Sequence, residues 1–117
     1  MIAKKFEDLI CWQKARELAN FIYILTGKDN FKSDFGLRDQ IRRSSVSVMS
    51  NIAEGFGRGG NNELVQFLFI AKGSVSEVKS QLYIASDLHY ISDKEFQKAH
   101  STTEDISRLI NAFIRSV

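Results

Sequence analysis

Residues 37–63 read LRDQIRRSSVSVMSNIAEGFGRGGNNE, and their pattern predicts a helix that ends abruptly in glycines. On a helix that turns by about 100° per residue, six of these residues share one face. This core face consists of Leu37, Ile41, Ser45, Val48, Ile52 and Phe56. A second apolar flank beside it consists of Val46, Met49 and Ala53. Because two flanks are apolar, we expect this helix to pack on more than one side.

Polar side chains form an ordered row on the opposite side of the same helix. The row contains Gln40, Arg43, Ser47, Asn51, Glu54 and Arg58. Neighbours in the row are three or four residues apart, so they can pair along the helix. Either Ser33 or Asp34 can cap the start of the helix. Four glycines end it, because each disfavours a helix by about 1 kcal/mol relative to alanine; they are Gly55, Gly57, Gly59 and Gly60.

The composition is that of one globular domain rich in helix. The chain has 117 residues, of which 44% are hydrophobic and 26% are charged, and we expect a single domain over residues 1–117. This composition excludes a disordered chain. The absence of proline favours long uninterrupted helices over a β-sandwich.

Charge and cysteine content narrow the classes of function. The formal net charge of +2 is too small to indicate nucleic-acid binding by itself, so any basic surface must be local. Cys11 is the only cysteine, which excludes an internal disulfide; we interpret it as a small buried hydrophobic residue in a reducing compartment. The first ten residues lack the apolar run of a signal peptide, and no segment reaches membrane-spanning length. A soluble cytoplasmic protein is therefore expected.

Three further helices follow from apolar residues that recur every three or four positions. The first runs over residues 9–26, with Asp8 as its N-cap. Gly27 ends this helix and opens a turn. Phe31 is expected to anchor the following loop on the core. Another runs from about residue 61 to residue 85. The last begins at an S-x-x-E capping box, residues 92–95, and continues to the C-terminus. Four helices joined by short turns predict an antiparallel up-and-down four-helix bundle.

The helix of residues 61–85 carries a second stripe on its other side. This stripe contains Ile70, Gly73, Glu77 and Ile84. A glycine inside a long helix weakens it unless another backbone packs closely, so Gly73 is expected to mark a close approach. Second apolar stripes on two helices predict self-association.

No pattern supports catalysis, a cofactor or a metal. Residues 55–60 match G-x-G-x-x-G, but a predicted helix precedes them instead of a strand, which favours a turn between helices over a dinucleotide site. As a weaker alternative, Arg58 and the backbone amides near it could bind a phosphate. His89 and His100 lack the Glu-x-x-His spacing of a di-metal site, and we interpret them as surface or turn residues.

Four arginines are the main candidates for function. Arg42 and Arg43 are adjacent, Arg38 lies one turn earlier and Arg58 lies at the far end of the same stretch. A guanidinium group suits a phosphate because it directs two parallel N–H donors at one oxyanion. These four residues are therefore candidates for nucleic-acid binding.

A purely structural network is the alternative interpretation, and the sequence supports it equally. In it the arginines pair with carboxylates of their own helix or the next, such as Glu54, Glu63 or Glu77. The residues that would hold helices or subunits together are Arg43, Ser47, Asn51, Glu54, Gly73 and Glu77.

Four segments resemble one protein family. They are FEDLICWQKARELA at 6–19, GLRDQIRRSSVSVMSNIAEGFGR at 36–58, NELVQFLFIAKGSVSEV at 62–78 and the turn LHYIS at 88–92. The most specific part is Arg42-Arg43 followed by Ser47 and by Asn51-Ile-Ala-Glu-Gly55. On these motifs the chain resembles the four helix bundle protein family, the 23S rRNA intervening-sequence proteins. These in turn resemble the accessory variability protein of diversity-generating retroelements.

The resemblance implies an antiparallel bundle that assembles into a homopentameric ring. It also implies a gene within an insertion in a large-subunit rRNA gene, and proteins of this kind have been labelled ribosomal. The retroelement relatives act without catalysis and bind a reverse transcriptase and nucleic acid through a basic surface.

Two functions of different classes follow. The first is a non-enzymatic homo-oligomeric bundle that binds RNA or a ribonucleoprotein through its arginines. The second is a protein-interaction scaffold or adaptor whose Arg/Glu row is purely structural. Neither function requires a cofactor, a metal or a membrane.

Overall fold

The computed structural model describes residues 3–117, and most of them are helical. Met1 and Ile2, which begin the domain expected over residues 1–117, lie outside the described residues. The elements are the 3₁₀ turn η1 (Phe6–Asp8) and the helices α1 (Ile10–Thr26), α2 (Asp29–Ser33), α3 (Phe35–Gly57), α4 (Asn61–Asp87) and α5 (Asp93–Ser116). None of the residues 3–117 forms a strand, which confirms the prediction of an all-α protein.

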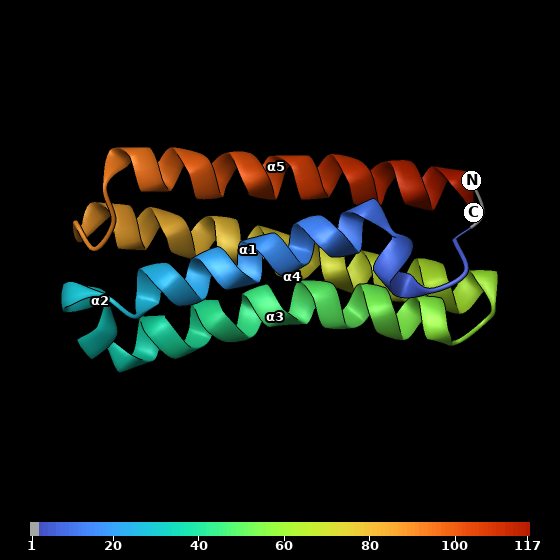
Figure 1. Cartoon of the computed structure of the whole chain (residues 1–117), viewed down its shortest axis with the longest axis horizontal. Helices are drawn as coiled ribbons and strands as arrows, with labels where there is room; N and C mark the ends of the chain where they lie inside the picture. Colours follow the sequence, from blue (N-terminus) through green and yellow to red (C-terminus); the bar gives the residue numbers. More distant parts are fainter. Residues whose placement is uncertain (1–2) are drawn as a thin grey trace.

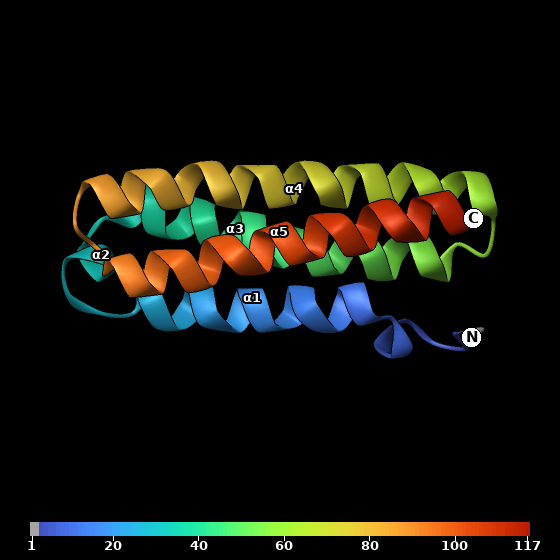
Figure 2. The ribbon, with the colours of Figure 1, turned by 90° about the horizontal axis from the view of Figure 1, so that it is seen from above.

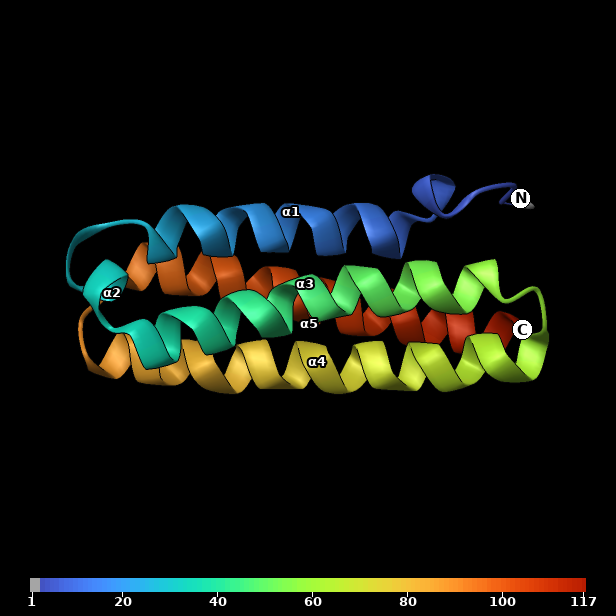
Figure 3. The same cartoon turned by 90° about the horizontal axis from the view of Figure 1, so that it is seen from below.

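Four long helices lie side by side, and each runs opposite to the next along the chain (Figure 1). α3 packs on α1 and α4, and α5 packs on the same two helices. Figure 2 and Figure 3 show α1 and α4 on opposite sides of the bundle, with α3 and α5 between them. The molecule measures 43 × 22 × 19 Å, and η1 and the C-terminus lie at the same end (Figure 1).

The core is a continuous column of apolar side chains between the four long helices. The predicted core face of α3 is confirmed, because four of its residues are buried and the two at its ends are half-buried: Ile41, Ser45, Val48 and Ile52, then Leu37 and Phe56. Cys11 is also buried as predicted, and burial raises the pKa of its thiol to about 11. No helix formed by residues 3–117 is both long enough and apolar enough to cross a membrane.

Small residues bring α3 and α4 close together. Gly55 is buried, and a Cβ atom there would lie 2.7 Å from the Cβ of Phe67 and 3.3 Å from the carbonyl oxygen of Leu64. About two turns earlier, the hydroxyl oxygens of Ser47 and Ser74 lie 2.9 Å apart across the same interface. Larger side chains at these positions would force the two helices apart.

The expectation of a close approach at Gly73 is wrong within this chain. No described atom lies within 4 Å of a Cβ built at Gly73. The reason is its position on the helix, because Ala71, Ser74 and Val78 face the interior whereas Gly73 lies on the exposed side of α4. The position at which a neighbouring helix comes too close for any side chain is Gly55.

Side chains cap two helices as predicted. Asp34 caps α3, since its Oδ1 accepts a hydrogen bond from the backbone N–H of Leu37 at 3.1 Å. Ser92 and Glu95 form the capping box of α5 through reciprocal bonds of 3.1 and 2.9 Å. The hydrogen bond from the Ser92 backbone, followed by that from Lys28, lowers the pKa of Glu95.

The loops differ from the predictions in two places. Asp8 does not cap α1, because it ends η1 and Leu9 is the N-cap residue. The residues after Gly27 form the short helix α2 instead of an open turn. α2 places Phe31 fully inside the core, where its ring stacks on Tyr90 with 5.2 Å between the ring centroids. The prediction that Phe31 anchors this loop is therefore confirmed.

Substitution of Gly55 by alanine is expected to destabilise the fold. The added methyl group would meet Phe67 Cβ at 2.7 Å, and neither helix backbone can move without disturbing the α3–α4 contact. We expect the free energy of unfolding to fall by about 1–3 kcal/mol, as for other overpacked core positions. Urea unfolding followed by circular dichroism measures this change.

Gly57→Ala is the matched control, because Gly57 lies in the last turn of the same helix and no neighbouring atom of residues 3–117 lies within 4 Å of a Cβ there. This variant should be neutral or slightly stabilising, since alanine favours a helix over glycine. Equal stability of both variants would show that the α3–α4 contact is not tight at Gly55.

Candidate nucleic-acid interface

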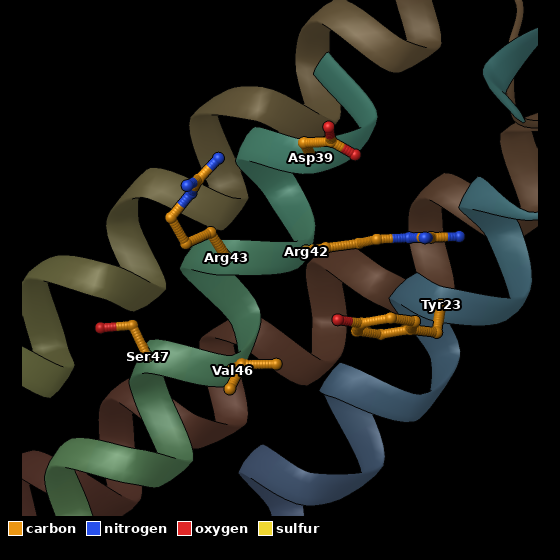
Figure 4. Close-up of a pocket in the computed structure, with 6 residues that line it drawn as sticks. All are labelled: Tyr23, Asp39, Arg42, Arg43, Val46 and Ser47. Carbon is orange, nitrogen blue, oxygen red and sulfur yellow. The ribbon is translucent and has the colours of Figure 1, made fainter. Parts of the chain in front are cut away.

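Three of the four candidate arginines gather in the N-terminal half of α3. Arg38, Arg42 and Arg43 lie within two turns of the helix, whereas Arg58 follows its last residue at the other end. Figure 4 shows that the Arg42 side chain extends towards α1, while the Arg43 side chain leaves the opposite side of α3 towards α4. The two guanidinium groups therefore point in different directions, and they can contact two different phosphates.

Contacts with α1 hold Arg42 in a defined orientation. Its Nε donates a hydrogen bond of 2.7 Å to Oγ1 of Thr26, which is fully buried and itself donates to the carbonyl oxygen of Ile22. The guanidinium carbon lies 4.6 Å from the centroid of the Tyr23 ring. A planar cation over an aromatic face is favourable by about 0.5–1 kcal/mol at an exposed site. Among residues 3–117, no carboxylate pairs with Arg42, so its terminal N–H groups are available to a ligand.

Arg43 is exposed, and within the described chain its guanidinium forms neither an ion pair nor a hydrogen bond. The structural alternative required Arg43 to pair with a carboxylate. The structure instead leaves this cation directed at solvent.

Arg38 is positioned by its own neighbours. Its Nε donates to Oδ1 of Asp39 at 2.8 Å, its Nη1 donates to the carbonyl oxygen of Lys32 at 3.0 Å, and its guanidinium carbon lies 4.8 Å from the Phe35 ring centroid. The hydrogen bond from Arg38 lowers the pKa of Asp39, and the charges of Arg38, Arg42 and Arg43 lower it further. Asp39 is therefore an ionised acceptor inside a cationic cluster at neutral pH.

Arg58 is separated from the other three arginines and is already paired. Its Nε donates to Oε2 of Glu54 at 3.0 Å, and its guanidinium carbon lies 5.1 Å from the Phe67 ring centroid. Arg58 therefore pairs with a carboxylate of its own helix, as the structural interpretation of the sequence predicted. Both side chains are about half exposed, so the pair contributes little to stability.

Of the remaining residues expected in the polar network, some form hydrogen bonds at the α3–α4 contact and others are exposed. Ser47 joins Ser74 of α4, and Nδ2 of Asn51 donates to the hydroxyl and carbonyl oxygens of Ser47 at 2.9 and 2.8 Å. Glu77 and Gly73 lie on the exposed side of α4 and contribute to no such bond within residues 3–117. The network expected from Arg43 to Glu77 therefore does not form as one unit within this chain.

Sequence reasoning missed Tyr23 and Thr26. Tyr23 is 46% exposed, and it lines an open pocket together with Arg42, Arg43, Val46, Ser47 and Asp39 (Figure 4). The sequence feature that could have identified Tyr23 is that it lies outside the apolar periodicity of the first helix. That signal is weak because single exposed aromatic side chains are common.

The histidines and the glycine motif are the other features that the sequence analysis considered for a site. Residues 3–117 contain no cluster of three His, Cys, Asp or Glu side chains that could hold a metal ion. His89 is exposed in the turn after α4, and His100 is half-buried on α5, where it stacks on Phe96. The glycines of residues 55–60 lie between two helices, so the dinucleotide interpretation is wrong.

A comparison with protein-family models matches residues 7–112 to the 23S rRNA-intervening sequence protein family. The chain belongs to this family. The match confirms the resemblance seen in the sequence motifs and covers all four long helices except the last residues of α5. A comparison with curated proteins finds no match.

A solved crystal structure has a fold similar to that of this chain. It is the crystal structure, at 1.70 Å resolution, of a protein with unknown function from the S23 ribosomal protein family of Bacteroides thetaiotaomicron VPI-5482. The two chains share 21% sequence identity and align with a TM-score of 0.82 over 91% of this chain and 96% of the other. This likeness shows that the chain shares the fold of that protein.

The pKa of Asp39 tests the described contact between Arg38 and Asp39. In Arg38→Ala the pKa of Asp39 should rise towards its ordinary value, because the hydrogen bond from Arg38 is the main cause of its depression. Titration of the Asp39 carboxyl carbon by NMR measures the change. Arg58→Ala removes the same charge at the other end of α3 and should leave this pKa unchanged. An Asp39 pKa that is the same in wild type and Arg38→Ala would contradict the described geometry.

Proposed function

We propose that this intervening-sequence protein is a non-enzymatic, self-associating bundle that binds RNA or a ribonucleoprotein through Arg38, Arg42 and Arg43. The observation that carries the proposal is the availability of the Arg42 and Arg43 guanidinium groups. Arg43 has no partner within residues 3–117, and Arg42 uses only its Nε on Thr26. Guanidinium groups without a carboxylate partner are suited to phosphate oxygens.

The cationic patch of one chain is small. It contains three arginines and the carboxylate of Asp39, and the whole chain carries a formal charge of only +2. Salt-dependent RNA affinity grows with the number of phosphates contacted, so a single copy would bind weakly. Several copies held in one assembly would multiply the patch without any new contact.

The exposed side of α4 supports self-association. Four large apolar side chains on it and that of Leu88, which directly follows the helix, are each about half exposed, and we call them the α4 stripe: Phe69, Ile70, Tyr83, Ile84 and Leu88. Gly73, which no atom of the described chain approaches, lies in the middle of this stripe and would allow another helix close access. We propose a homo-oligomer that packs through this surface, and the family resemblance suggests five copies.

RNA retention across a salt series tests the leading proposal. Wild-type protein should retain a labelled structured RNA at low salt and lose it as salt rises. Arg43→Ala should weaken binding by roughly five- to tenfold per copy engaged and reduce the salt slope by about one, because one phosphate contact is lost.

Arg58→Ala is the matched control, because it removes the same charge from an arginine already paired with Glu54. Its affinity for the same RNA should stay close to that of wild type. Salt-independent retention, no retention at low salt, or equal effects of the two variants would contradict RNA binding by the patch.

A protein-interaction scaffold is the second candidate, and the α4 stripe is the observation that favours it. In that case the stripe would bind a different protein, and the Arg/Glu row would be purely structural and hold subunits together instead of binding RNA. Loss of the oligomer in Arg43→Ala, with unaltered RNA behaviour, would support the scaffold.

Self-association is expected to depend on the α4 stripe. Ile70→Glu places a carboxylate in the middle of the proposed apolar interface, so sedimentation velocity at micromolar concentration should show smaller species than for wild type. Ile24→Glu is the control, since Ile24 is 60% exposed but lies on α1. A stable wild-type monomer at this concentration would exclude the proposed assembly.

A further inference from the structure

The cationic patch is short along α3. Arg38 and Arg43 are five residues apart, which corresponds to about 8 Å along a helix axis. At a rise of about 3.4 Å per nucleotide, this length matches only about two phosphates of one strand. Proteins that recognise double-stranded RNA by its shape contact grooves over about 16 base pairs.

The patch does not continue along the rest of α3. Ser47 and Asn51 are occupied by their mutual bond and by Ser74, and Arg58 is balanced by Glu54. The exposed row beyond Arg43 therefore adds no free cation that could follow the backbone of a duplex.

An aromatic ring lies beside this short patch. Tyr23 lies between the Arg42 side chain and Val46 in Figure 4, and it is 46% exposed at the pocket. An RNA base that is unpaired presents its face to such a ring, whereas bases inside a duplex are covered by their neighbours. A guanidinium plane fixed against the ring adds a second surface on which a base can stack.

We propose that the pocket at Tyr23 and Arg42 holds one unpaired nucleotide, so the protein recognises RNA at a single-stranded segment. The base stacks on the Tyr23–Arg42 pair and contacts the methyl groups of Val46. Arg43, on the other side of α3, contacts the phosphate of a neighbouring nucleotide. This inference rests on the RNA binding proposed above and adds which state of the RNA is bound.

The pocket also contains an acceptor that a phosphate would avoid. Asp39 uses Oδ1 for Arg38, and its carboxylate repels a phosphate placed directly against it. The same carboxylate accepts hydrogen bonds from the amino groups of bases. Its presence among the lining residues fits a base in the pocket better than a continuous phosphate backbone.

Fluorescence anisotropy with two RNAs tests the inference. One is a labelled 12-nucleotide strand without self-complementarity, and the other is the blunt duplex formed by the same strand and its complement. Wild-type protein should bind the single strand at least fivefold more tightly than the duplex. Tyr23→Ala should weaken single-strand binding by about fivefold or more, since stacking contributes about 1–3 kcal/mol per base. Duplex binding should change by less than twofold.

Two variants separate stacking from other effects. Tyr23→Phe keeps the ring and should bind the single strand like wild type. Ile24→Ala removes an apolar side chain that is 60% exposed on the same helix but does not line the pocket, and it should leave single-strand affinity unchanged. Thermal unfolding of Tyr23→Ala followed by circular dichroism checks that the fold is kept.

The outcomes distinguish this inference from the proposed function. If wild type binds the duplex as tightly as the single strand, or if Tyr23→Ala weakens both equally, the inference is wrong although RNA binding stands. If wild type binds neither RNA at low salt, both proposals are wrong.

Discussion

The close contact between α3 and α4 is the constraint on which the rest of the structure depends. Gly55 lets the two backbones approach at Phe67, and the Ser47–Ser74 hydroxyl pair satisfies two polar groups that the same contact removes from water. These small residues leave α3 little freedom to rotate about its axis. The rotation in turn decides which side of its polar row faces α4 and which faces solvent.

That orientation gives the members of one polar row three different roles. Ser47 and Asn51 turn towards α4 and become part of the packing. Arg58 is neutralised by Glu54 at the C-terminal end. Only the N-terminal end keeps free cations, because Arg43 points to solvent and Arg42 finds a neutral hydroxyl instead of a carboxylate. A local basic surface therefore exists on a chain whose net charge is close to zero.

The contact between α1 and α3 gives this surface its rigidity. Thr26 is buried and fixed to the backbone of its own helix, so its hydrogen bond from Arg42 ties a half-buried guanidinium to the core. A side chain held in place before binding loses less conformational entropy when a ligand arrives. The same contact presents Tyr23 next to the cation, which combines charge with an aromatic face in one pocket.

The sequence by itself determined the four long helices, the core face of α3, the capping box of α5 and the family. These features depend on apolar period, glycine positions and caps, which act within a few residues of the chain. Tertiary structure alone decided that Gly55 and not Gly73 is the point of close approach, that no carboxylate of a neighbouring helix reaches Arg43, and that Tyr23 joins Arg42. Each of these depends on the distance and rotation between helices, because a side chain on an exposed arc has no partner until another helix is placed beside it. Periodicity reports which face of a helix is buried but not which neighbour covers it.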